Sequence, residues 1–428
     1  MPAVIDEHPG RQESRAAALA ARFVAIRRFS ERLAAPLSPE DQTVQSMPDA
    51  SPTKWHLAHT TWFFETFILA RFDGDYQPFD PRYGYLFNSY YEAVGARHPR
   101  PQRGLLSRPG VDEILAYRRH VDRAMGELMA RAEGKADAAL CDLLELGLNH
   151  EQQHQELILM DIKHVLSVNP LRPAYQPARP RAETPIWPMR WLRHGGGLVE
   201  VGHAGHGFAF DNEGPRHRVW LEPFALATRL VTCAEFLQFI EDDGYRRPEF
   251  WLSEGWATIN ARGWTAPLYW EDVGGRWHVF TLSGQRPVAM DEPVCHVSFF
   301  EAAAYAKWAG KRLPTEAEWE QAAATLKLRG NLADTGVLHP MPAADRGGMQ
   351  QMVGDAWEWT ASPYVAYPRY REPEGAIGEY NGKFMANQMV LRGGAAVTPP
   401  GHLRITYRNF FPPDTRWMFS GIRLAEDW

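Results

Sequence analysis

A proline-rich stretch near the middle of the chain places the strongest constraint on its fold. Six prolines lie between residues 168 and 190, and these are Pro170, Pro173, Pro177, Pro180, Pro185 and Pro188. Proline fixes φ and has no backbone N–H, so neither a helix nor a sheet continues through such a run. We expect a stiff linker at 169–190 between domains at 12–168 and 191–428. A length of 428 residues also exceeds one ordinary core and favours two or three domains.

The first domain has the apolar periodicity of long helices. Apolar residues recur at intervals of three and four over 14–37, 53–72, 110–132 and 137–167. Pro52 opens the second of these segments, and Ser51 is its expected N-cap. A looser stretch, 73–109, would form the one long connection. Four helices joined in this way predict a four-helix bundle.

The second domain has a different pattern of apolar and turn-forming residues. Short apolar runs alternate with Gly, Pro, Asn and Asp, and only 231–245 and 297–323 keep a helical period for long. This pattern predicts a loop-rich α+β domain with short strands.

Composition excludes several classes of protein. A formal net charge of −6 and a pI near 6.3 argue against a nucleic-acid-binding surface. The three cysteines are far apart and form no CxxC pair, which suits a reducing cytoplasm. The N-terminus lacks the apolar core of a secretory signal, and no uncharged apolar run reaches the ~20 residues that span a bilayer. We therefore expect a cytoplasmic protein without a membrane or nucleic-acid partner.

Three histidines are expected to face the core of the bundle. His150 and His154 are four residues apart and so lie on one face of a helix. The apolar seam that contains them consists of Leu143, Gly147, His150, His154 and Leu157. In the second helix, His59 lies on a line with Trp55 and Trp62. Imidazoles that face a core need a polar partner, and a metal ion is one such partner.

A metal is not the only reading of this pattern, because two histidines four apart are common in helices without one. His56 and His164 lie nearby and could be surface residues. The chain has no HExxH motif, which disfavours a zincin protease. Glu151 and Glu156 are expected to point away from the seam, so a carboxylate ligand would have to come from elsewhere.

Several longer motifs carry a family resemblance. They are SPTKWHLAHTTWFFETF, YLFNSYYEAVG, NHEQQHQEL, VTCAEFLQFIEDDGY, PVCHVSFFEAAAYAKWAGKRLPTEAEWE, GDAWEWTASPY, LRGGAA and RNFFPPDTRWMFSGIRLA. The first part of the chain resembles the DinB-like bundle of the ergothioneine-biosynthetic sulfoxide synthases (EgtB type). The second part resembles the formylglycine-generating-enzyme-like domain that accompanies this bundle. The motifs span nearly the whole chain in the order typical of that family.

The resemblance implies an activity and a cofactor. It implies non-haem Fe(II) held by His59, His150 and His154, with His56 not a ligand. The implied substrates are hercynine (trimethylated histidine), O2 and a thiol, and the implied product is a sulfoxide on carbon 2 of the imidazole. Residues 404–424 lack the cysteine pair of the formylglycine-generating enzymes, so we expect no such activity. The second domain is expected to form a wall of the bundle's active site.

The resemblance also suggests roles for further residues. Tyr90 and Tyr91 are the candidate proton donors, with Tyr91 favoured. Gln153 and Asn409 would bind the hercynine imidazole. Aromatic faces attract a quaternary ammonium, and the candidates are Phe410, Phe411 and Trp417.

Arginine is the natural partner of the thiol's carboxylate. The candidates are Arg82, Arg97 and Arg100, with Arg103 nearby. The Tyr-Tyr pair resembles the branch of the family that uses free cysteine, so cysteine is favoured over γ-glutamylcysteine. We interpret Arg312, Glu316, Glu318 and Trp357 as structural residues.

Other functions are compatible with the sequence. DinB-like bundles also host metal-dependent thiol transferases, which need no O2. A carbohydrate- or protein-binding module would explain the tryptophans of the second domain but not the three histidines. Within the family, a selenoneine synthase that joins hercynine to a selenosugar is an alternative. Ovothiol synthases usually carry an additional methyltransferase domain, which this chain lacks.

Overall fold

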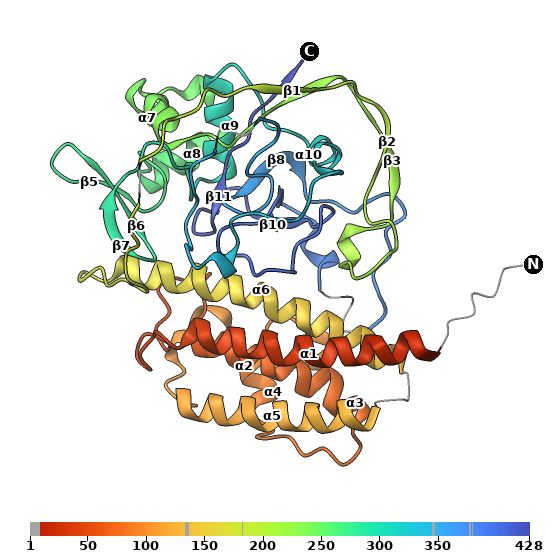
Figure 1. Cartoon of the computed structure of the whole chain (residues 1–428). Coiled ribbons are helices and arrows are strands. Elements are labelled where there is room, and N and C mark those ends of the chain that lie inside the picture. Colours follow the sequence, from red (N-terminus) through yellow and green to blue (C-terminus); the bar gives the residue numbers. More distant parts are fainter. Residues whose placement is uncertain (1–8, 133–136, 182, 345–346, 376–377, 379) are drawn as a thin grey trace, which may run out of the picture. The chain divides into compact units, whose positions relative to one another are not determined.

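The computed structural model describes residues 9–132, 137–181, 183–344, 347–375, 378 and 380–428 (Figure 1). The chain divides into two compact units, Met1–Val165 and Leu166–Trp428. The first unit is helical, whereas the second combines short strands with helices. The predicted fold class, a helical bundle followed by an α+β domain, is confirmed.

The first unit is built from long helices that lie side by side in Figure 1. They are α1 (Pro9–Ala34), α2 (Thr53–Phe64), α5 (Val111–Ala132) and α6 (Ala138–Val168). A π-helical turn, η1 (Glu65–Leu69), and the short α3 (Ala70–Phe72) extend α2. The long connection contains α4 (Tyr83–Phe87), η2 (Glu92–Val94) and η3 (Arg100–Leu105).

Helix α2 is the centre of the bundle, because every residue from Thr53 to Phe64 is buried. Helix α6 packs against it at Gly147. A Cβ at Gly147 would lie 2.7 Å from Phe64 Cε1 and 3.0 Å from Phe63 Cε1. Since real Cβ atoms do not approach other atoms so closely, only glycine allows α6 this close to α2. The seam predicted around Gly147 therefore faces α2.

The N-terminus of α2 differs from the prediction. The N-cap position is occupied by Pro52, without a side-chain capping bond. Ser51 Oγ instead accepts a hydrogen bond of 2.9 Å from Arg103 Nη1, and the Ser51 backbone N–H donates to Asp161 Oδ2 at 2.8 Å. The Ser51 capping prediction was wrong because its hydroxyl bonds a buried arginine.

The strands of the second unit form four small sheets within the described residues. One joins β1 (Trp191–His194), β4 (Phe224–Ala227) and β12 (Ala425–Asp427). Another has the order β10–β9–β8–β11, from Asn409–Phe411, Met389–Arg392, Trp357–Pro363 and Ser420–Gly421. The others are the hairpin of β2 (Gly197–Val201) with β3 (His217–Leu221), and β5 (Trp270–Asp272), β6 (Trp277–Thr281) and β7 (Gly284–Pro287).

Three of the four main helices of the second unit begin at capping boxes, namely α7 (Cys233–Glu241), α9 (Phe299–Trp308) and α10 (Glu316–Ala323). The fourth is α8 (Ser253–Arg262). The period predicted across 297–323 is thus divided between α9 and α10. Gly310, at φ 65°, lies just beyond α9, and Thr315 starts α10 with a capping box to Glu318.

Buried ion pairs stabilise the second unit. Arg423 Nε and Glu358 Oε2 lie 2.7 Å apart, and both side chains are fully buried. Glu316 accepts from the buried Arg408 and Arg392, while the partly exposed Arg312 pairs with Glu318. Trp357 is 1% exposed. These contacts agree with a structural role for the RLPTEAEWE and GDAWEWT motifs.

Among the helices of the described residues, none is both long and apolar enough to cross a membrane.

Candidate metal centre

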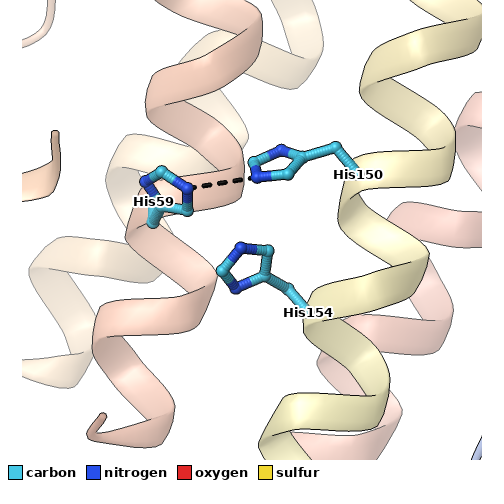
Figure 2. A group of neighbouring side chains, drawn as sticks. All are labelled: His59, His150 and His154. Carbon is cyan, nitrogen blue, oxygen red and sulfur yellow. Dashed lines mark hydrogen bonds between the residues drawn. The ribbon is translucent and has the colours of Figure 1, made fainter. Parts of the chain in front are cut away.

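Three buried histidines converge in the first unit. His59 on α2 and His150 and His154 on α6 point toward one another (Figure 2). One potential ligand atom from each lies within 4.8 Å of the other two. The Nε2 atoms of His59 and His150 are 3.1 Å apart. Two nitrogens bound to one metal at 2.0–2.1 Å are separated by about 3 Å, so this spacing suits a shared ion.

The histidines are neutral imidazoles. Burial lowers the pKa of His150 to about 3. Burial, and then the proximity of His150, lowers the pKa of His59 and of His154 well below the usual range. Metal ions bind the neutral ring through a nitrogen lone pair. The site is therefore ready to bind a metal at neutral pH without first losing protons.

Neighbouring groups hold the His59 ring in place. Trp55 stacks on it with centroids 4.7 Å apart and planes 9° apart, and Trp62 lies on it at 5.4 Å and 19°. His59 Nδ1 is 2.6 Å from the carbonyl oxygen of Phe87. A carbonyl only accepts, so Nδ1 carries the hydrogen and Nε2 keeps its lone pair for a metal.

His56 is not a surface residue, contrary to one of the interpretations of the sequence. It is 3% exposed, with Nδ1 2.8 Å from His154 Nδ1 and Nε2 2.9 Å from Asp161 Oδ2. It lies on α2, every residue of which is buried. Its link to Asp161 joins residues 105 positions apart and could not be read from the sequence. His164 is partly buried and bonds Ser46 Oγ at 2.6 Å.

Glu151 is buried but is occupied by arginines. Its carboxylate accepts from Arg27 Nη1 at 2.9 Å, Arg118 Nη2 at 3.0 Å and Ser30 Oγ at 2.6 Å. Burial alone would raise the pKa of Glu151, but the charges of Arg27 and Arg118 lower it to about 2. The carboxylate next to His150 in the sequence thus serves an ion cluster, as expected for a side chain that points away from the seam.

Tyr90 and Tyr91 lie in the same unit as the histidines. Tyr91 is fully buried, and its ring centroid is 5.7 Å from that of Trp62, which stacks on His59. Tyr90 is partly buried and stacks on Tyr91 at 4.7 Å. One aromatic ring therefore connects Tyr91 with the histidine cluster.

The arginine candidates differ in their surroundings. Arg82 is 85% exposed and paired with Asp80, and Arg97 pairs with Glu92. Arg100 is exposed and donates to the Asp49 carbonyl.

Arg103 is buried, and its guanidinium carbon lies 3.4 Å from the ring centroid of Trp55. Burial, and then the charge of Arg100, lowers the pKa of Arg103 to about 8. The charges of Arg103 and Arg100 both help to lower the pKa of His56, after burial. Both arginines thus act electrostatically on His56, and Arg103 also acts on His59 and His154.

The remaining candidates lie in two places. Gln153 precedes His154 on α6 and is half-buried. Asn409, Phe410 and Phe411 form strand β10 of the second unit, and all three are half-buried. Phe410 stacks on Tyr364 at 3.9 Å, and Phe411 meets Trp417 edge to face at 5.8 Å. A role in hercynine binding stays a prediction for Gln153, Asn409, Phe410, Phe411 and Trp417.

Two family models match the chain. The sulfatase-modifying factor enzyme 1-like domain matches residues 190–428, more than half of the chain, and the DinB superfamily matches residues 22–158.

Several known proteins are similar to this chain in sequence or structure. The chain is 34% identical to the hercynine oxygenase of Mycolicibacterium thermoresistibile, over 89% of this chain and 88% of that protein. It is 33% identical to the hercynine oxygenase of Mycobacterium tuberculosis, over 89% and 92% of the two chains. The formylglycine-generating enzyme of Streptomyces coelicolor is 28% identical over 55% of this chain and 88% of its own. Among solved structures, PvdO from Pseudomonas aeruginosa aligns with a TM-score of 0.37 and 21% identity, over 56% of this chain and 94% of PvdO.

Proposed function

The chain belongs to the hercynine oxygenase family of oxidoreductases, and from this premise we propose that it joins the sulfur of cysteine to carbon 2 of the hercynine imidazole. The reaction uses O2 and Fe(II) and yields a sulfoxide. One observation carries the proposal. Three buried, neutral imidazoles converge within 4.8 Å in a chain 34% identical to a hercynine oxygenase over 89% of its length.

The donor set fits Fe(II). His59, His150 and His154 would hold the ion through ring nitrogens, and imidazole is a common ligand of iron. Three protein ligands leave further coordination positions for substrates. The neighbouring carboxylate of Glu151 is saturated by Arg27 and Arg118, which favours a ligand set of histidines alone. When bound, Fe(II) supplies the electron-transfer chemistry that lets O2 oxidise the sulfur.

Tyr91 would supply the proton that this oxidation requires. Its ring lies against Trp62, which in turn stacks on His59, so packing holds Tyr91 one aromatic ring away from the cluster. A phenol that packs on fixed aromatic rings needs little reorganisation before it donates. Tyr90 stacks on Tyr91 and would orient it.

Arg100 is the best placed of the three arginine candidates to bind the carboxylate of the thiol substrate. It is exposed and acts electrostatically on His56, the neighbour of His154, whereas Arg82 and Arg97 are engaged by Asp80 and Glu92. A guanidinium binds a carboxylate through two parallel hydrogen bonds. Gln153, next to His154, would bind the hercynine imidazole through its amide.

The test is O2 consumption by the Fe(II)-loaded protein with hercynine and cysteine, γ-glutamylcysteine or a selenosugar in turn, with mass spectrometry of the products. We expect uptake with cysteine and formation of hercynylcysteine sulfoxide. His154→Ala should abolish both, whereas His164→Ala on the same helix should retain them. A Tyr91→Phe variant should still bind Fe(II) but form less sulfoxide.

Other outcomes would replace the proposal. Turnover with γ-glutamylcysteine alone would change the sulfur donor, and a selenium adduct from the selenosugar would make the protein a selenoneine synthase. Thiol transfer without O2 uptake would indicate a metal-dependent thiol transferase.

A further inference from the structure

A chain of hydrogen bonds runs from a carboxylate to one of the three clustered histidines. Asp161 Oδ2 lies 2.9 Å from His56 Nε2, and His56 Nδ1 lies 2.8 Å from His154 Nδ1. Asp161, His56 and His154 are all at least nine-tenths buried. The same oxygen of Asp161 accepts the Ser51 backbone N–H at 2.8 Å, which anchors the carboxylate.

The position of each hydrogen follows from these contacts. A carboxylate oxygen only accepts, so His56 Nε2 must carry a hydrogen and donate it. A neutral imidazole ring has a single hydrogen. His56 Nδ1 therefore holds a lone pair and accepts.

The acceptor at His56 fixes the tautomer of His154. The 2.8 Å contact needs one hydrogen, and only His154 Nδ1 can provide it. The other nitrogen of His154, Nε2, then keeps its lone pair. Figure 2 shows one ring nitrogen of His154 turned toward His59 and His150 and the second turned away from them.

We propose that His56 and Asp161 are positioning residues of the metal centre, which hold His154 in the tautomer and orientation that present Nε2 to the ion. This inference rests on the metal site of the proposed function but names residues that touch neither substrate nor metal. The Phe87 carbonyl does the same for His59 through Nδ1. Partners of this kind typically change metal affinity by about 10–100-fold when removed.

The tautomers can be measured in the metal-free protein. A long-range ¹H–¹⁵N correlation spectrum of chelator-treated, ¹⁵N-histidine-labelled protein reports which ring nitrogen carries a hydrogen. We expect hydrogen on Nδ1 of His154 and on Nε2 of His56. Hydrogen on Nε2 of His154 would overturn the proposal. This measurement uses the wild-type protein and needs no variant to fold.

Metal affinity provides the second readout, with Co(II) as the probe in competition with a chelating dye. His56→Phe keeps the ring volume but removes the acceptor, and we expect the affinity for Co(II) to fall by about 10–100-fold. His56→Asn places an amide oxygen near the position of Nδ1 and should restore most of it. His164→Phe, whose histidine bonds Ser46, is the matched control and should bind as the wild type does.

The two proposals fail in different ways. Wild-type protein that shows the expected tautomers and the His56→Phe loss, yet makes no product from hercynine, would overturn the proposed function and leave this inference standing. Normal turnover together with unchanged Co(II) affinity in a folded His56→Phe variant would overturn the positioning role and leave the function standing.

Discussion

Two faces of α6 bury polar groups in opposite ways. On one face, His150 and His154 are neutral rings whose nitrogens converge with those of His59. On another face, Glu151, which follows His150 in the sequence, is a charged carboxylate enclosed by Arg27 and Arg118. Both groups are buried, but only Glu151 has opposite charges as partners.

The difference separates stability from function. A buried charge must be compensated, so Glu151 and its arginines depend on one another for the fold. Neutral imidazoles cost less to bury, and their converging lone pairs leave a place for a cation. The fold can therefore keep a group of metal-binding side chains in its core because the charged residues nearby are already paired.

Removal of the Glu151 carboxylate is expected to have the largest effect. Glu151→Ala leaves Arg27 and Arg118 buried without their anion, and we expect the free energy of unfolding to fall by about 3–5 kcal/mol. Urea denaturation of the metal-free protein measures this loss. Glu151→Gln retains a hydrogen-bond acceptor for Ser30 and should lose less. A loss below about 1 kcal/mol for the alanine variant would show that the cluster behaves as a surface pair.

Metal addition tests the other face. An ion that binds only the folded protein, at a free concentration 100 times its Kd, should raise the free energy of unfolding by about 2.7 kcal/mol. Co(II) added to chelator-treated protein should produce this gain in urea melts. His59→Ala should remove the gain, whereas His164→Ala should keep it. Equal stabilisation of both variants would place the ion elsewhere.

The two faces should also respond to different pH ranges. The pKa of His150 falls from its ordinary value near 6.5 to about 3 on folding, so the unfolded chain binds more protons between these values. The contribution of His150 to the free energy of unfolding is then fully present above pH 6.5. It is lost as the pH falls toward 3, by up to about 1.4 kcal/mol per pH unit. The pKa of Glu151 is lowered to about 2, so its contribution is lost only below its unfolded value near 4.3.

Urea melts of chelator-treated protein between pH 7 and pH 5 separate the effect of the histidines from that of Glu151, because Glu151 stays ionised throughout. The slope of stability against pH should be smaller in His150→Phe than in the wild type. Identical slopes would mean that His150 is protonated to the same extent in the folded and unfolded states.

The histidine cluster could be predicted from the sequence because the helical spacing of neighbouring residues indicates which side chains share a face. A helical period places His150 and His154 on one face of a helix, in the same seam as Gly147. The resemblance of the motifs then implied the same three residues. The α+β character of the second unit was likewise visible in its short apolar runs and frequent turn residues.

Partnerships between distant residues could not be predicted in this way. Asp161 reaches His56 across 105 positions, and Arg27 and Arg118 reach Glu151 from two other helices. Strand β12 pairs with β4 about 200 residues earlier. Such contacts depend on the packed bundle or sheet, and nothing in the local pattern around Ser51 or His56 reveals them.

The smallest expected effect comes from an ion pair on the exposed part of α6. Asp142 accepts from Arg15 at 2.8 Å, with side chains 67% and 42% exposed. Water already solvates both charges, so Asp142→Ala should cost only about 0.2–1 kcal/mol, measured by urea denaturation. Arg15 also keeps its contact with Glu145.

Added salt should reduce the cost of Asp142→Ala further, whereas the cost of Glu151→Ala should change little, because screening acts mainly on exposed charges. A cost for Asp142 close to that for Glu151 would mean that the number of ion pairs, not their burial, determines the stability of this helix.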